Sequence, residues 1–189
     1  EEFGKHLDIP IINGLSDIGH PCQIMSDILT YEESNGAIEG KKVAWLGDGN
    51  NNMSISLIEA AGKFKFNLSI ACPKKYSPNK KILSWAKKNK VKLIVTTKPE
   101  EAVKNSDCVM TDKWVSMNDK VNKKAKKKIL KPFQVNKKLM SKANSGAIFM
   151  HCLPVGREEE VTDEVIDGKQ SVVWRQALNR VHAQKSIIK

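Results

Sequence analysis

Short apolar segments alternate along most of this chain with segments that carry apolar residues at helical spacing. The apolar segments show no alternation of polar and apolar positions, which is typical of strands buried on both faces of a sheet. Strands that are separated by helices predict a parallel sheet. The predicted strands are Val43–Leu46, Leu68–Ala71, Leu93–Val95, Cys108–Met110 and Ala147–Met150, with a sixth candidate at Val172–Val173.

The segments between these strands predict helices on both faces of the sheet, which makes a three-layer, Rossmann-like α/β fold. The predicted helices are Met53–Ala61, a helix that begins at Ser77-Pro78, and Pro99–Lys104. Gly62 is expected to close the first of them, because glycine is favoured just past a helix end. In the second helix, Ile82, Leu83 and Ala86 are expected on one face.

Two further helices flank this predicted core. Pro21 lies at the favoured first-turn position of one helix, which has an apolar stripe of Ile24, Ile28 and Tyr31. The other helix runs from about Arg175 to the end of the chain, with Leu178, Val181 and Ile188 on one side. A terminal amphipathic helix must bury its apolar side, and nothing in the sequence says that the covering surface lies within this chain.

The composition favours a globular protein of a reducing compartment. The chain has 189 residues, of which 40% are hydrophobic. No apolar run approaches the roughly 20 residues that cross a bilayer. The first residues, Glu1-Glu2, do not resemble a secretory signal. The four cysteines are scattered without a Cys-x-x-Cys pair, which argues against a zinc site or a disulfide framework. We therefore expect a cytoplasmic protein with no membrane partner.

The net charge of +11 is densest from Lys120 to Lys138 and raises the question of a nucleic-acid or anion-binding face. This segment has one aromatic residue, Phe133, and no arginine. Nucleic-acid surfaces usually add stacking and bidentate donors to charge. The composition thus favours a solvated lysine-rich surface, and we expect no nucleic-acid partner.

A strand-to-helix turn, Gly47 to Asn52, is the first polar cluster with chemical potential. Glycines permit a sharp turn, and the following helix N-terminus offers free N–H groups to an anion. A dinucleotide site is disfavoured, because Asn52 replaces the third glycine of G-x-G-x-x-G and no acid follows the second strand. A simpler alternative is that Asp48 and the asparagines only cap the helix.

Three more polar clusters lie at predicted strand or helix ends: Thr111–Met117, His20–Gln23 and His151–Pro154. Asp112 suits a substrate ammonium, although it could also be an ordinary turn residue. The imidazole of His20 and the side-chain amide of Gln23 can donate to a carbonyl oxygen that gains charge. Alternatively, this cluster simply caps a helix. Cys152 follows His151 directly, and adjacent strand residues point to opposite faces, which argues against a Cys–His nucleophile.

The carboxyl ends of parallel strands meet at one edge of the sheet, where ligands of open α/β proteins collect. Asn51, Asp112 and Cys152 each follow such a strand end. We therefore predict that these three side chains line one shared cleft.

Taken together, the clusters resemble the aspartate/ornithine carbamoyltransferase family, and its ornithine-specific members in particular. The resemblance runs nearly end to end. It rests on Pro10–Asp17, the His-Pro-x-Gln motif at 20–23, Trp45–Asn51, Thr111–Met117, His151–Pro154 and Ala177–Arg180. Two features point to ornithine rather than aspartate as the acceptor. One is the His-Cys-Leu-Pro motif, and the other is the combination of Asp112 with Ser116-Met117.

The resemblance implies two α/β domains, one for carbamoyl phosphate and one for the amino acid. On this basis residues 1–35 would be an interdomain segment and linking helix, 36–174 the ornithine-binding domain, and 175–189 a C-terminal helix that packs on a missing carbamoyl-phosphate domain. The family's Ser-Thr-Arg-Thr-Arg phosphate loop is absent from this sequence, and Asn118 stands where the family usually has Gly. Homotrimers, and no cofactor or metal, are also implied.

The resemblance also implies roles for individual residues in transferring a carbamoyl group to ornithine, a step of arginine biosynthesis. The carbamoyl-phosphate side would comprise His20, Gln23 and Arg180. The ornithine side would comprise Asn51, Asp112, Ser116, Met117, Cys152 and the Leu153 carbonyl. Cys152, His20 and Arg180 would be the catalytic residues. Two alternatives remain: an ornithine-binding module without turnover, or a carbamoyltransferase for a related amine.

Overall fold

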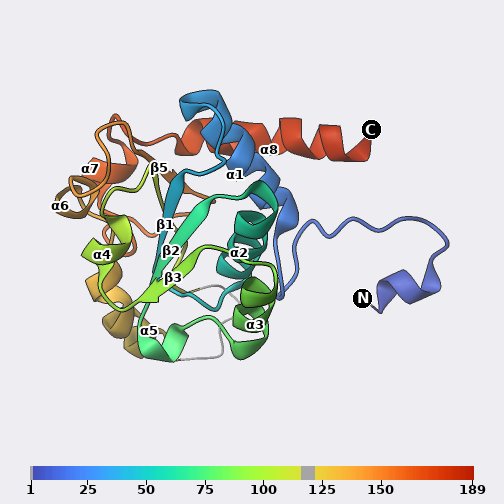
Figure 1. Cartoon of the computed structure of the whole chain (residues 1–189), viewed down its shortest axis with the longest axis horizontal. Coiled ribbons are helices and arrows are strands. Elements are labelled where there is room, and N and C mark those ends of the chain that lie inside the picture. The colour runs from blue at the N-terminus through green and yellow to red at the C-terminus, as the bar shows by residue number, and fades with distance from the viewer. Residues whose placement is uncertain (1, 116–121) are drawn as a thin grey trace.

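The computed structural model describes residues 2–115 and 122–189, and it shows a five-stranded parallel sheet (Figure 1). The strand order is β3-β2-β1-β4-β5. The strands are β1 Lys42–Leu46, β2 Asn67–Ala71, β3 Leu93–Thr96, β4 Cys108–Thr111 and β5 Ile148–His151. The chain winds outward from β1 in one direction through β2 and β3, and in the other through β4 and β5. The order therefore reverses between β1 and β4, a topological switch point.

Helices cover both faces of this sheet, which confirms the predicted three-layer α/β fold (Figure 1). The α-helices are α1 Pro21–Asn35, α2 Asn52–Phe64, α3 Lys80–Lys88, α4 Pro99–Val103, α5 Lys123–Leu130, α6 Lys137–Met140, α7 Asp163–Ile166 and α8 Val173–Ile188, with short 3-10 turns at Phe3–His6, Lys74–Tyr76 and Lys131–Phe133. Alternate residues of β1 face opposite layers. Val43 and Trp45 pack with α1 and α2, whereas Ala44 and Leu46 pack with α4, α6 and α7.

The candidate sixth strand at Val172–Val173 is wrong. Ser171 makes only an isolated bridge to Phe149, and α8 begins at Val173. The N–H of Gln176 donates to the carbonyl of Val172, which starts the helix at this point. Two β-branched apolar residues resemble a buried strand, but here Val173 is a buried helix residue.

Gly62 does not end α2, contrary to the prediction, because the helix continues to Phe64 and closes on Lys65 in the left-handed conformation. A Cβ at Gly62 would lie 3.1 Å from Val91 Cγ2 and 3.2 Å from Trp85 Cη2. The glycine therefore permits close packing against the α3–β3 region. The local sequence pattern resembled a helix end, but close contact with residues distant in the sequence explains why glycine occurs at position 62.

The outer edge of the sheet is less buried than its apolar sequence predicted. In β3, Ile94 is 62% exposed and Val95 is also exposed. Leu83 of α3, expected on the buried face, is exposed as well, whereas Ile82 and Ala86 are buried. These residues lie at the end of the sheet, where fewer elements are available to cover them.

The last helix packs on α1 with a largely polar stripe rather than with its apolar side. Gln176 and Asn179 are fully buried there, and Asn179 Nδ2 donates to Thr30 Oγ1 at 3.0 Å. Leu178, Val181 and Ile188, on the other side, are 46–77% exposed. The segment before Asn13 extends away from the body of the domain (Figure 1), and residues 7–18 also expose apolar side chains. The described residues therefore leave one apolar region uncovered.

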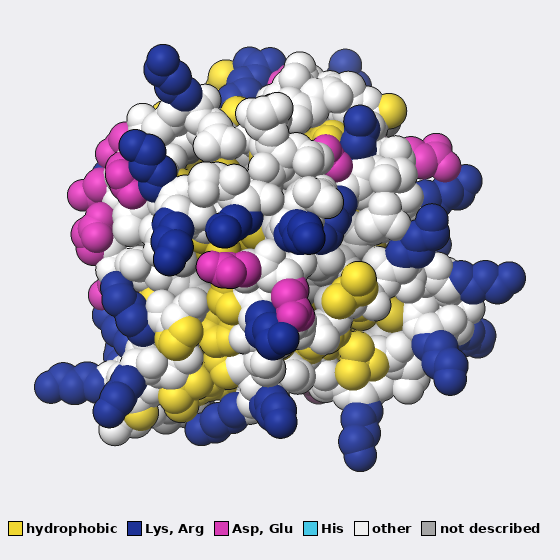
Figure 2. All heavy atoms as spheres, turned by 60° about the vertical axis from the view of Figure 1, so that its left-hand side comes forward, with side chains coloured by type: hydrophobic (Ala, Val, Ile, Leu, Met, Phe, Trp, Pro, Cys, Tyr) yellow, Lys and Arg dark blue, Asp and Glu magenta, His cyan; other side chains and the backbone are white. Residues whose placement is uncertain are grey.

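Lysines dominate the charged surface without forming an uninterrupted basic face. Figure 2 shows lysine and arginine side chains spread over one view of the molecule, with acidic side chains among them. In α5, Lys126 is buried and pairs with Asp48 at 2.8 Å, while Lys127 pairs with Glu159. The arrangement agrees with a mostly solvated surface. No helix of the described residues has the length and apolar character that a membrane span requires.

Candidate active site

Asn51 lies at the start of α2, after the turn that follows β1. Its Oδ1 accepts from the N–H of Ser54 at 2.8 Å, so it does cap the helix. Its Nδ2 donates to Asp112 Oδ2 at 3.1 Å. The capping role and the role in the polar cluster are therefore compatible in one side chain.

The turn that presents Asn51 requires close backbone packing. Gly47 has φ +120°, a conformation that favours glycine. A Cβ at Gly49 would lie 2.9 Å from both Cys72 Sγ and the carbonyl oxygen of Tyr76. The turn is thereby pressed against the β2 end, and Asn51 is held above the sheet.

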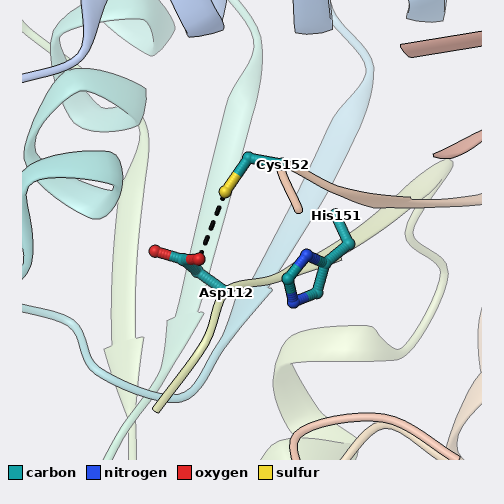
Figure 3. Close-up of side chains that lie close together, drawn as sticks. All are labelled: Asp112, His151 and Cys152. Carbon is teal, nitrogen blue, oxygen red and sulfur yellow. Dashed lines mark hydrogen bonds between the residues drawn. The ribbon is translucent and has the colours of Figure 1, made fainter. Parts of the chain in front are cut away.

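Asp112 follows β4 and stands between Asn51 and Cys152. The Sγ of Cys152 donates to Asp112 Oδ1 at 3.1 Å (Figure 3). Burial, together with the negative charge of Asp112, raises the pKa of the Cys152 thiol well above its usual value. Cys152 is therefore a neutral thiol that donates its proton, rather than a thiolate. These direct hydrogen bonds confirm that Asn51, Asp112 and Cys152 come together. That the three side chains line one shared cleft stays a prediction.

His151 turns away from the thiol and does not hydrogen-bond with it. Its side chain is completely buried, with Nε2 3.3 Å from Glu160 Oε1. Its Nδ1 accepts from the N–H of Leu153 at 2.9 Å. These partners, together with the high thiol pKa, agree with the prediction against a Cys–His nucleophile. His151 instead holds the backbone of Leu153, which has a positive φ of 56°.

The ligand atoms of Asp112, His151 and Cys152 lie within 4.8 Å of one another, a spacing that could hold a metal ion. In the structure these atoms already have hydrogen-bond partners: both Asp112 oxygens accept, and His151 Nδ1 accepts from Leu153. A metal would have to replace those bonds.

His20, Gln23 and Arg180 form a second polar group where α1 meets α8. Arg180 Nη1 donates to Gln23 Oε1 at 2.5 Å. Burial, and then the charge of Arg180, lower the pKa of His20. Its side chain does not cap α1, so the simple capping alternative is wrong, and its Nδ1 is buried without a hydrogen-bond partner among the described residues. His20 Nδ1 and Arg180 Nε are thus the buried atoms of this group that lack a hydrogen-bond partner among the described residues.

The two polar groups lie within electrostatic range of each other. The charge of Asp112 acts on His20, partly opposing the fall in its pKa. The charge of Asp27, a buried carboxyl group one helical turn from Gln23, contributes to the raised pKa of Cys152. Ser116 and Met117 lie outside the described residues.

Sequence reasoning missed Asp27 and Gln176. Asp27 Oδ1 accepts from Gln23 Nε2 at 2.8 Å and from Gln176 Nε2 at 2.7 Å. One signal was available, because Gln23 and Asp27 are polar residues one turn apart in a helix whose other face is apolar. Gln176 offered no comparable local signal.

A doubly wound parallel sheet with an amide, a carboxylate and a thiol gathered near its switch point is typical of the class of α/β domains that bind small polar ligands. Comparison with known families makes this class specific: residues 39–189 match the model described as the aspartate/ornithine carbamoyltransferase Asp/Orn binding domain. The chain belongs to the aspartate/ornithine carbamoyltransferase family.

Individual relatives agree with this assignment. An ornithine carbamoyltransferase of Brucella abortus (strain 2308) is 51% identical over 187 residues, which cover 99% of this chain and 59% of that protein. Among solved structures, ornithine carbamoyltransferase from Pyrococcus furiosus is 43% identical with a TM-score of 0.92, and the match covers 99% of this chain and 61% of that one. Anabolic ornithine carbamoyltransferase from Campylobacter jejuni is 37% identical with a TM-score of 0.93, covering 99% and 63%. The chain thus spans about three fifths of the length of these relatives.

Proposed function

We propose that this chain is the amino-acid-binding part of an ornithine carbamoyltransferase. Such an enzyme transfers the carbamoyl group of carbamoyl phosphate to the δ-amine of ornithine, giving citrulline and phosphate. The observation that carries the proposal is the hydrogen-bonded cluster of Asn51, Asp112 and Cys152 at the switch point of the sheet. The names of the relatives support ornithine as the acceptor.

On the ornithine side, Asp112 would pair with the α-ammonium group and Asn51 would donate to the α-carboxylate, with Ser116 and Met117 completing that end. The Cys152 thiol and the Leu153 carbonyl would lie near the δ-amine. Because the thiol is protonated and already donates to Asp112, its role would be to orient and not to attack. Holding two substrates at attack distance can supply much of the rate.

On the carbamoyl side, His20, Gln23 and Arg180 would hold and polarise the carbamoyl group. The nitrogen of the neutral δ-amine attacks the carbamoyl carbon, and the carbonyl oxygen gains negative charge. That charge would be stabilised by the guanidinium of Arg180 and the imidazole of His20. The carbonyl then re-forms as the bond to the phosphate oxygen breaks, phosphate leaves with the electron pair, and the former amine gives one proton to the departing phosphate.

The carbamoyl-phosphate domain would come from the part of the relatives that this chain does not match. The exposed apolar side of α8, with Leu178, Val181 and Ile188, and the exposed segment 7–18 would pack against it. Assembly into homotrimers, a cytoplasmic location and a place in arginine biosynthesis belong to the same proposal.

Two measurements test this proposal. Calorimetry on the 189-residue chain should show ornithine binding that is weakened by Asp112→Asn and unchanged by Glu59→Gln, an exposed control on α2. A colorimetric citrulline assay should show turnover only in a full-length context, in which the chain is joined to the unmatched part of a relative. Turnover with aspartate or another amine, but not with ornithine, would refute the proposal that ornithine is the acceptor. Turnover by the chain alone would refute the need for the further domain.

A further inference from the structure

The buried carboxyl group of Asp27 lies on α1, one turn beyond Gln23, and is only 1% exposed. No ion pair joins it to a cation among the described residues, and burial raises its pKa to about 6. The charge of Arg180 offsets this only in part. Burial of a carboxyl group without an ion-pair partner is costly. The hydrogen bonds of Asp27 show what this arrangement achieves.

A single oxygen of Asp27 fixes two glutamine side chains on different helices. Its Oδ1 accepts from Gln23 Nε2 on α1 at 2.8 Å and from Gln176 Nε2 on α8 at 2.7 Å. The acceptor attracts the NH₂ end of each amide, so each carbonyl end must point elsewhere. Asp27 therefore sets the amide orientation of both glutamines.

The first consequence concerns Arg180. Because the NH₂ group of Gln23 faces Asp27, its Oε1 is free to accept from Arg180 Nη1. A reversed amide would place its NH₂ group against the guanidinium, where two donors would meet. The direction of Arg180, and with it the charge that acts on His20, thus depends on Asp27.

The second consequence concerns the end of β5. The Oε1 of Gln176 accepts from the backbone N–H of His151 at 2.9 Å. His151 is the last residue of this strand and directly precedes Cys152. The same Asp27 oxygen that directs Arg180 therefore also anchors the strand that presents the thiol.

We propose that Asp27 is a positioning residue that aligns the carbamoyl side with the ornithine side by fixing the amides of Gln23 and Gln176. Asp27 touches neither substrate and acts only through these two glutamines. The inference rests on the proposed function, but the network itself can be tested without turnover.

The first experiment is an NMR titration of His20 in the 189-residue chain. Asp27→Ala removes the acceptor, so Arg180 should move away and the pKa of His20 should rise toward its ordinary value. Asp27→Asn keeps Oδ1 and should leave the low pKa of His20 in place. Thr30→Val is the matched control, because Thr30 makes another buried α1–α8 hydrogen bond and its side-chain bonds go to Asn179 and Ser26 rather than to either glutamine. An unchanged His20 in Asp27→Ala would overturn the proposal.

Gln176→Leu provides a second route if Asp27→Ala fails to fold. It removes the bonds of Gln176 to Asp27 and to the His151 N–H but leaves the bond between Gln23 and Asp27. It should therefore weaken ornithine binding to the chain while the titration of His20 stays unchanged. Two results would contradict the proposal that Asp27 acts separately through Gln23 on Arg180 and through Gln176 on β5. One is loss of the low pKa of His20 in this variant, and the other is an unaltered affinity for ornithine.

The second experiment measures citrulline formation in the full-length context. Asp27→Ala should lower kcat by roughly 100-fold, the loss expected when reacting groups are misplaced by about 1 Å. Asp27→Asn should restore most of this loss, and Thr30→Val should change kcat little. Equal losses in Asp27→Ala and Thr30→Val would show a merely structural role. If the unmodified protein forms no citrulline, the proposed function fails, whereas the His20 titration still decides the positioning role.

Discussion

The stability of the 189-residue chain should depend on pH through Asp27, and Asp27→Asn should remove that dependence. The pKa of this carboxyl group rises from 3.8 to about 6 on folding, mainly because it is buried. The folded chain therefore binds more protons at this site than the unfolded chain does between these two values. It follows that the stabilising effect of the proton is complete below pH 3.8 and is lost as the pH rises through 6.

The size of the effect follows from the shift. Each pKa unit corresponds to about 1.4 kcal/mol, so a shift of roughly two units gives at most about 3 kcal/mol. Arg180 on α8 and Asp112 beyond β4 are the charged groups that act on Asp27, with opposite signs. The asparagine variant has no proton to lose, and its Nδ2 replaces the buried, unpartnered Oδ2 at a cost that does not depend on pH.

Urea unfolding followed by tryptophan fluorescence at pH 4, 5, 6 and 7 provides the assay. Relative to the unmodified chain, Asp27→Asn should gain up to about 3 kcal/mol between pH 4 and pH 7. Thr30→Val, a buried but non-titrating change on the same helix, should differ from the unmodified chain by a constant amount. If the difference in free energy of unfolding between Asp27→Asn and the unmodified chain were also independent of pH, the pKa of Asp27 would not be raised in the folded chain.

Three further predictions follow from individual contacts. Gly62→Ala should destabilise the chain by up to about 2 kcal/mol in urea unfolding, because crowding by a Cβ 3.1 Å from Val91 exceeds the roughly 1 kcal/mol that alanine gains over glycine inside a helix, whereas Gly146→Ala, with open space around it, should be nearly neutral; equal effects would contradict close packing at Gly62. In the full-length context, Asp112→Asn should chiefly raise the KM for ornithine and leave carbamoyl phosphate binding nearly intact; an equal loss of both would place Asp112 elsewhere in the mechanism. Cys152→Ala should reduce citrulline formation without abolishing it, because the thiol is protonated; complete loss, with an S-carbamoylcysteine (thiocarbamate) trapped in the unmodified enzyme, would demonstrate covalent catalysis instead.

Much of the fold could be predicted from the sequence, because each strand is short, apolar and followed by a helical pattern. Two of the errors, Gly62 and Val172–Val173, have a common cause. Both are short local patterns whose meaning depends on tertiary contacts: Gly62 meets the α3–β3 region, and Val173 is buried at the start of α8. Local sequence cannot distinguish a glycine at a helix end from one that permits close packing.

The convergence of Asn51, Asp112 and Cys152 was predictable for a different reason. Asp112 and Cys152 directly follow a strand, and Asn51 follows the short turn after β1. Parallel pairing brings the carboxyl ends of β1, β4 and β5 to one edge regardless of side-chain detail. The positions of these residues relative to the sheet could therefore be predicted from the sequence. The hydrogen bonds that join them could be seen only in the structure.

The network around Asp27 could not be predicted in this way, because its members come from helices rather than strand ends. Asp27 and Gln176 lie 149 positions apart, and no repeat or period connects them. Parallel pairing fixes which strand ends meet, but the register between α1 and α8 is set by side chains alone. A buried polar network has few alternative arrangements, since each unpaired group costs free energy. The polar stripe of α8 therefore specifies this register more strictly than an apolar stripe of similar size would, and that register places Arg180 beside Gln23.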